Sequence, residues 1–178
     1  DTVANPTNHA YFNLSGNPDE TVETHFLKIN ANYFTETDDD QLPTGELAEV
    51  EGTMMDFRES KQIGRDIDKP FRAVIDGIGY DNNFCLYKKD FTLQEAAVLE
   101  HKESGRVLEV FTDLPGIQLY CGGWLAKQGN PGKANGKVTY RRGAALETQF
   151  YPDTVHFADV FPSRFVKANE EFKTTTEF

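Results

Sequence analysis

Two stretches far apart in the chain each place an ionisable side chain where it can take part in proton transfer. His9 lies in NPTNHAYFNLSG, where three asparagines and two aromatic residues surround it. Because histidine titrates near neutral pH, such an imidazole can donate a proton to a bound substrate. The pattern also fits a histidine in a strand whose nitrogens are satisfied by neighbouring amides, and both interpretations stay open on the stretch alone.

Glu147 lies in ALETQFYPD, between apolar residues in a stretch typical of a strand. A buried carboxylate must be paired or hydrogen-bonded, and carboxylates of this kind are candidates for general bases. The alternative is a glutamate that points to solvent from a half-exposed strand.

Asp81 lies in GYDNNFCL, directly after a glycine-containing turn. Such turns can present a carboxylate to a ligand, since loops often carry functional residues. The alternative is an aspartate that caps the turn through its own backbone bonds. Gly79 and its neighbours do not form a phosphate-binding fingerprint, because the spacing is incomplete and no helix is expected after them.

Other polar or aromatic groups carry weaker signals. The acidic run Asp38–Asp40 has the oxygen density of a calcium loop but no EF-hand pattern, so a solvated loop is favoured. Trp124 and Tyr120 can form a platform for stacking a sugar, although core packing is the stronger interpretation for both. We treat the remaining histidines as structural because their spacing does not suit a metal: His25, His101 and His156.

The segments that must position these residues have strand patterns. Alternating or β-branched runs predict antiparallel strands, and in Arg106–Leu114 the side chains of Val107 and Leu108 fall on opposite faces. A short helix is predicted over Phe57–Ile63, capped by Asp56, and an exposed loop over 130–143. Many short strands separated by Gly, Pro and Asn favour a large antiparallel β-sandwich in a single domain, 1–178. The other predicted strands cover Thr24–Phe34, Asn82–Tyr87, Ala96–His101, Ile117–Tyr120 and Ala144–Phe150.

Composition and charge narrow the class of ligand. The chain has 178 residues, a net charge of −11 and 12% aromatic residues, which suits a packed globular protein. That charge would repel a phosphate backbone or an anionic membrane, so we expect neither nucleic acid nor membrane as a partner. A neutral small molecule is compatible with it.

Cysteine usage bears on the compartment. Cys85 and Cys121 both lie in apolar stretches without metal-type spacing, which favours free, buried thiols over a disulfide. There is no run of about 18 apolar residues and no secretory signal. The expected location is therefore the cytoplasm.

Taken together and in order, six stretches resemble the aldose 1-epimerase (galactose mutarotase) family, and the resemblance covers essentially the whole chain. The details look closest to animal members. The stretches are NPTNHAYFNLSG, LPTGELAEVEGTMMDFRE, GYDNNFCL, SGRVLEVFTDLPGIQLYCGGWL, ALETQFYPD and FPSRFVKANEEFKTTTEF.

The resemblance implies a function and a fold. It makes His9 the general acid, Glu147 the general base, and Asp81 and Gln118 the residues that hydrogen-bond sugar hydroxyls. The implied activity is interconversion of the α and β anomers of free hexoses by ring opening and closure. The family fold is a large antiparallel β-sandwich, and no metal, nucleotide or other cofactor is implied.

Departures from the family pattern also carry expectations. Asn82 stands where the family usually has His, Gly123 where Asn is usual, and His156 where Asn is usual; each is expected to affect substrate preference or activity. The chain resembles a C-terminal portion, truncated on its N-terminal side, and the family's N-terminal part supplies an arginine and a second histidine. We therefore expect residues 1–178 alone to be inactive and poorly stable.

Two competing functions remain at this point. One is a non-catalytic sugar-binding module on the same sandwich, although the presence of both His9 and Glu147 favours the enzyme. The other is an epimerase of hexose 6-phosphates, which needs a basic cluster for the phosphate. Arg141 and Arg142 are adjacent, so in a strand they would point to opposite faces.

Overall fold

The computed structural model describes residues 1–71, 78–87, 90–125, 130–132, 135–162 and 165–178. Two stretches used above, the loop at 130–143 and the C-terminal motif, therefore include residues outside this description (133–134 and 163–164). The described chain is built from antiparallel strands, with two short 3-10 turns, η1 (Val22–Thr24) and η2 (Ile63–Arg65). Within these ranges no helix is long and apolar enough to cross a membrane.

One layer is a six-stranded antiparallel sheet. Its strands lie in the order β2-β13-β10-β7-β4-β5. Their bounds are β2 (Tyr11–Phe12), β13 (Ala144–Gln149), β10 (Gly116–Tyr120), β7 (Asp81–Leu86), β4 (Ala31–Thr37) and β5 (Pro43–Glu49).

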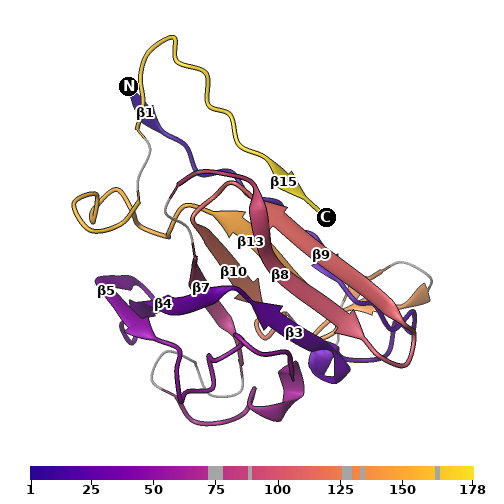
Figure 1. Cartoon of the computed structure of the whole chain (residues 1–178). Helices are drawn as coiled ribbons and strands as arrows, with labels where there is room; N and C mark the ends of the chain where they lie inside the picture. The colour runs from indigo at the N-terminus through magenta and orange to yellow at the C-terminus, as the bar shows by residue number, and fades with distance from the viewer. Residues whose placement is uncertain (72–77, 88–89, 126–129, 133–134, 163–164) are drawn as a thin grey trace.

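The second layer is a five-stranded antiparallel sheet in the order β15-β9-β8-β3-β6. Figure 1 shows its long β8–β9 pair beside the strands of the first sheet. Its strands are β15 (Thr176–Glu177), β9 (Arg106–Thr112), β8 (Gln94–His101), β3 (Phe26–Ile29) and β6 (Lys61–Gln62). The predicted antiparallel β-sandwich is thus confirmed.

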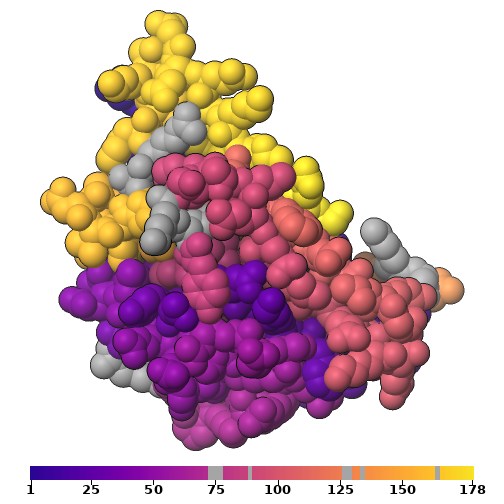
Figure 2. Space-filling view, viewed as in Figure 1, coloured from indigo at the N-terminus to yellow at the C-terminus, as the bar shows by residue number. Residues whose placement is uncertain are grey.

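Two short strand pairs lie outside these layers. The first pairs β1 (Thr2–Val3) with β14 (Phe165–Val166), and the second is the hairpin of β11 (Asn130–Pro131) with β12 (Lys137–Val138). In the space-filling view the C-terminal segment, in yellow, projects from one end of the molecule (Figure 2).

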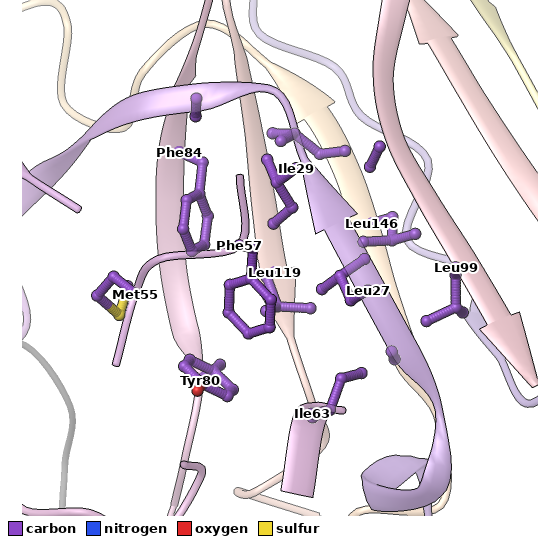
Figure 3. Packing of buried hydrophobic residues seen from close by; sticks show 14 of the residues in the cluster. Leu27, Ile29, Met55, Phe57, Ile63, Tyr80, Phe84, Leu99, Leu119 and Leu146 are labelled. Atoms are coloured by element: carbon purple, nitrogen blue, oxygen red, sulfur yellow. The ribbon is translucent and has the colours of Figure 1, made fainter. Parts of the chain in front are cut away.

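The core fills the space between the two sheets. Leu119 of β10 and Leu27 of β3 are fully buried and come from opposite layers. Phe57 comes from the loop after β5; its ring lies 6.0 Å from that of Phe84 in the six-stranded sheet, and its carbonyl accepts the N–H of Ile29 in β3 (Figure 3). One apolar residue supplied by a loop therefore links the two sheets.

The predicted strand Thr24–Phe34 is wrong as a single element. The chain leaves the five-stranded sheet after β3 and enters the six-stranded sheet at β4, so the two parts belong to different layers. Asn30 makes the crossing: its N–H donates to Ala96, and its carbonyl accepts from Tyr87. An apolar pattern can continue across such a crossing because both layers face the same core.

The predicted helix Phe57–Ile63 is also wrong. Asp56 does not cap a helix; its carboxylate accepts the backbone N–H and the guanidinium of Arg58 in a tight turn. Lys61 then turns inward, and its Nζ lies 2.8 Å from Asp66 and 2.6 Å from the carbonyl of Met54. These tertiary contacts outweigh the local helical pattern.

The predicted exposed loop over 130–143 is only partly correct, because it contains the β11–β12 hairpin and ends in the buried residues Thr139 and Arg141. Cys85 and Cys121 are free and buried, as expected.

Candidate active site

The three central strands of the six-stranded sheet have two different faces. Side chains alternate along a strand, so every second residue of β7, β10 and β13 points to the same face. Phe84, Leu119 and Leu146 are at most 1% exposed and face the core. The residues between them face outward and are mostly polar.

Register brings the outward residues into rows. Gln118 pairs with Glu147 on one side and with Asn83 on the other, which gives a fully polar row. In the next row Tyr120 pairs with Asp81. Directly opposite residues of antiparallel strands have neighbouring side chains on one face. Asp81, Gln118 and Glu147, predicted from distant motifs, therefore lie together.

The second row continues toward the edge of the sheet. Tyr120 pairs with Ala145, and Ala145 pairs with Tyr11 of the edge strand β2. Because Ala145 carries only a methyl group, the two flanking tyrosine rings approach each other across it, with centroids 6.0 Å apart.

His9 reaches this face from the loop that precedes β2. Its Nε2 lies 3.3 Å from Oε1 of Glu147, and the two side chains are 47% and 10% exposed. His9 lies in a loop and contacts Glu147, so the alternative of a strand histidine satisfied by neighbouring amides is wrong, and so is the solvent-facing alternative for Glu147. Burial raises the pKa of Glu147, and the carboxylate of Asp81 adds to this, while His9 opposes it.

Two aromatic rings hold the imidazole of His9. Its ring centroid lies 5.0 Å from that of Tyr11 and 5.9 Å from that of Tyr120, with the latter pair edge to face. The hydroxyl of Tyr120 accepts the backbone N–H of Trp124 at 3.1 Å. Burial, together with the negative charge that Tyr120, Glu147 and Asp81 can carry, raises the pKa of Tyr11 to about 12.

Asp81 and Gln118 form a hydrogen-bonded pair beside this centre. Gln118 Nε2 donates to Asp81 Oδ1 at 2.8 Å. Burial raises the pKa of Asp81, whereas hydrogen bonds from Gln118 and Trp124 and the charge of His9 act in the opposite direction. The pair offers a carboxylate oxygen and an amide N–H, a combination that suits sugar hydroxyls.

Sequence reasoning missed part of the site. Asn83 and Gln149 lie two residues after Asp81 and Glu147, on the same faces of β7 and β13, and period-two alternation would have found them. Tyr11, next but one to His9, was missed as well. The core-packing interpretation of Trp124 is wrong, because this residue is 59% exposed. Tyr120 is buried, but on the outer face of the sheet.

The three departures from the family pattern fall in different environments. Asn82 is 2% exposed and faces the core side, opposite Leu119. At Gly123 an added Cβ would come within 1.9 Å of the carbonyl oxygen of Ile78, so this backbone admits no side chain there. His156 is exposed and pairs with Asp153 in a turn.

The two adjacent arginines are already paired with carboxylates. Arg141 contacts Glu23 at 3.2 Å and Asp68 at 2.6 Å, and Arg142 contacts Asp19 at 2.7 Å. Both lie in a turn and not in a strand. Their guanidinium groups are therefore not gathered as a phosphate-binding cluster.

His25, His101 and the acidic run make contacts within the fold. His25 and His101 are buried with ring centroids 4.7 Å apart, and His25 Nε2 accepts the N–H of Leu14. Asp38 accepts backbone N–H groups within its own turn. In the part of the chain that the structure describes, no three His, Cys, Asp or Glu side chains gather as metal ligands.

A hollow of about 460 Å³ lies beside His9 at the edge of the six-stranded sheet. Its lining includes His9, Tyr11, Lys137, Val138 and Gly143. The imidazole of His9 is therefore accessible from this hollow.

Comparison with known proteins identifies the family of this chain. The profile of the family described as aldose 1-epimerase matches residues 1–178. The chain is 39% identical over 178 residues to galactose mutarotase from Sus scrofa, covering 99% of this chain and 49% of that protein. It is 33% identical over 177 residues to aldose 1-epimerase from Escherichia coli, covering 98% of this chain and 49% of that protein. It thus spans about half the length of these relatives.

Solved structures agree with the sequence comparison. An aldose epimerase homologue from C. elegans superposes with a TM-score of 0.75 at 32% identity, over 90% of this chain and 46% of that one. Galactose 1-epimerase from Lactobacillus acidophilus superposes with a TM-score of 0.72 at 29% identity, over 98% of this chain and 47% of that one. The fold and the sequence therefore lead to one family.

Proposed function

Because the chain belongs to the aldose 1-epimerase family, we propose that it carries the acid–base pair and a sugar-binding surface of an enzyme that interconverts the anomers of free hexoses such as galactose and glucose. The observation that carries the proposal is the 3.3 Å approach of His9 Nε2 to Glu147 Oε1, on the face that also holds the Asp81–Gln118 pair.

The reaction needs an acid and a base close together. The anomeric hydroxyl and the ring oxygen of a hexose are bonded to the same carbon, so the groups that act on them must be neighbours. Glu147 takes the proton of the anomeric hydroxyl while His9 protonates the ring oxygen. The bond between that oxygen and the anomeric carbon breaks, which gives the open-chain aldehyde.

Closure on the other face of the aldehyde completes the cycle. Rotation about the bond between the first two carbons exposes that face, and the sugar hydroxyl attacks it while His9 takes its proton back. Glu147 returns its proton to the carbonyl oxygen, so the enzyme regains its starting state. Each well-placed acid or base of this kind contributes about 10²–10⁴-fold to the rate.

The environment of Glu147 supports its role as a base. A general base works best when its pKa lies near the working pH, and burial raises the pKa of Glu147 in that direction. The charge of a protonated His9 opposes the rise, which favours the reactive combination of carboxylate and imidazolium. Asp81 and Gln118 hold hydroxyls farther from the reacting carbon.

We further propose that the protein works in the cytoplasm. The support for this is that both cysteines, Cys85 and Cys121, are buried free thiols, and such thiols persist in a reducing compartment.

Polarimetry tests the function directly. Fresh α-D-galactose and α-D-glucose are added to the full polypeptide in which this chain occurs, and the rotation is followed against buffer. We expect acceleration with either sugar. If no aldohexose responds, the enzyme proposal fails; binding without acceleration would favour a sugar-binding module, and acceleration confined to hexose 6-phosphates would change the substrate class.

A further inference from the structure

A row of amide side chains continues behind the Asp81–Gln118 pair. Gln149 Nε2 lies 3.4 Å from Gln118 Oε1 and 3.3 Å from Asn83 Oδ1, so one amide group serves two acceptors. Gln149 is 9% exposed and Asn83 is 2% exposed. Buried amides are costly unless they are hydrogen-bonded, and no step of the proposed reaction uses either residue.

The carboxylate of Asp81 determines which way every amide in this row points. An ionised carboxylate only accepts hydrogen bonds, so Gln118 must turn its NH₂ group toward Asp81. The carbonyl oxygen of Gln118 then faces Gln149, which must present its own NH₂ group. That group in turn requires the carbonyl oxygen of Asn83. With Asp81 ionised, this order sets an NH₂ group against an oxygen at each contact of the row, and it leaves Nδ2 of Asn83 without a partner among the described residues.

The backbone leaves room for this row at Gly116. Gly116 is the residue opposite Gln149 in the β10–β13 register. An added Cβ at Gly116 would lie 2.6 Å from Asn83 Oδ1 and 3.0 Å from the ring of Tyr151. Any side chain at this position would therefore displace Asn83 from the row.

We propose that Gln149, supported by Asn83, is a positioning residue for sugar recognition that holds Gln118 with its NH₂ group toward Asp81. In this orientation the second N–H of Gln118 and the carboxylate of Asp81, which also accepts a hydrogen bond from Trp124, are set to face two neighbouring hydroxyls of the hexose. If the Gln118 amide turned over, its carbonyl would oppose the Asp81 carboxylate and the sugar would lose a donor. This inference rests on the proposed function, and it names the device that selects the hydroxyl pattern.

The first test removes the hydrogen bonds of Gln149 while keeping its length. In Gln149→Met we expect KM for galactose to rise about tenfold, the effect of losing one well-placed hydrogen bond. The value of kcat should stay within about twofold, and its pH profile should not move, because His9 and Glu147 are untouched. Gln94→Met is the matched control, since Gln94 is exposed on β8. Unchanged KM in Gln149→Met overturns the inference.

A double-mutant cycle separates positioning from general packing. If Gln149 acts through Gln118, the KM of the combined variant with Gln118→Met should equal that of Gln118→Met alone. Independent, multiplying effects would overturn the proposal. If Gln149→Met does not fold, Asn83→Ala removes the support of the row and should raise KM by a smaller factor, again with kcat unchanged; no rise would overturn it.

Calorimetric titration with galactose distinguishes this inference from the proposed function. If the unchanged protein binds galactose without turning it over, the enzyme proposal fails, and weaker binding by Gln149→Met but not by Gln94→Met still supports the positioning role. Equal affinity in all three proteins overturns it. If the unchanged protein binds neither galactose nor another aldohexose, both proposals fail.

Discussion

Two buried carboxylates in this molecule have nearly the same exposure and opposite acid–base behaviour. The side chain of Glu147 is 10% exposed and that of Asp66 is 7% exposed. Burial acts on both to raise the pKa. At Asp66, hydrogen bonds from Lys61 and Lys69 outweigh burial and hold the pKa below its ordinary value. At Glu147, burial prevails and the pKa is raised.

The partners explain the difference. Lys61 is itself 9% exposed, donates to Asp66 and to the carbonyl of Met54, and lies 4.3 Å from the centre of the Phe57 ring. The partner of Glu147 is the half-exposed ring of His9. The Lys61–Asp66 pair is closed to solvent, so it keeps its carboxylate ionised and holds loops to the core. The His9–Glu147 pair is open to solvent, so its carboxylate can exchange a proton with a ligand.

The largest expected effect is loss of activity at the open pair. Glu147→Gln keeps the shape of the side chain but cannot accept a proton, so the mutarotation rate should fall by about 10²–10⁴-fold. Sugar binding should remain largely intact, as measured by calorimetry. Glu109→Gln, at an exposed position on β9, is the control. If Glu147→Gln retained more than about a tenth of the activity, Glu147 would not be the base.

The next largest effect is loss of stability at the closed pair. Lys61→Met should lower the free energy of unfolding by about 3 kcal/mol, because it leaves the carboxylate of Asp66 buried without its main partner. Activity per folded molecule should not change. Denaturant unfolding measures the loss, and adding Asp66→Leu should restore part of it by removing the unpaired charge. A loss below about 0.5 kcal/mol would show that the pair is not structural.

Stability measured against pH should separate the two carboxylates by sign. Asp66, with a folded pKa below 3.8, contributes stability at neutral pH that disappears as the pH falls through its lowered value. Asp66→Asn should therefore be less stable than the unchanged protein at pH 7, with a gap that closes in acid.

For Glu147 the sign is reversed. Its folded pKa lies above 4.5, so the ionised folded state is penalised as the pH rises past that value. Glu147→Gln should be more stable than the unchanged protein at pH 7 and equal to it below pH 4.5. Unfolding curves for Asp66→Asn and Glu147→Gln between pH 3 and 8 test this prediction. If both variants differed in stability from the unchanged protein in the same direction at pH 7, the prediction would be contradicted.

The smallest effect concerns the rings that hold His9. Tyr120→Phe keeps the ring but removes the hydroxyl that accepts the N–H of Trp124. We expect the mutarotation rate to fall about three- to tenfold, the size of one neutral hydrogen bond. Tyr33→Phe, at an exposed tyrosine, is the control. If the two variants had equal rates, His9 would be held in place by the rings and not by the hydroxyl of Tyr120.

Much of the secondary structure followed from the sequence alone. Alternation of apolar and polar residues located β7, β8, β9, β10 and β13 to within about two residues, because burying one face of a strand imposes a period of two. Distinct motifs singled out His9, Asp81 and Glu147, and the family resemblance added Gln118. The structure brings all four onto one face.

Other features depended on tertiary structure. The break at Asn30 arises because two layers share one core, which makes the pattern continuous where the chain changes sheet. The turn at Asp56 and the inward course of Lys61 depend on Asp66 and the carbonyl of Met54, which no local propensity encodes.

The composition of the site was decided in the same way. The sequence specified which residues alternate along each strand, but the register between β7, β10 and β13 placed Gln118 between Glu147 and Asn83. Register depends on packing the opposite face, where Leu119 lies beside Leu146. A slip of one residue would turn Glu147 into the core and Leu146 toward the outer face, so the apolar side of the sheet determines the geometry of the polar side.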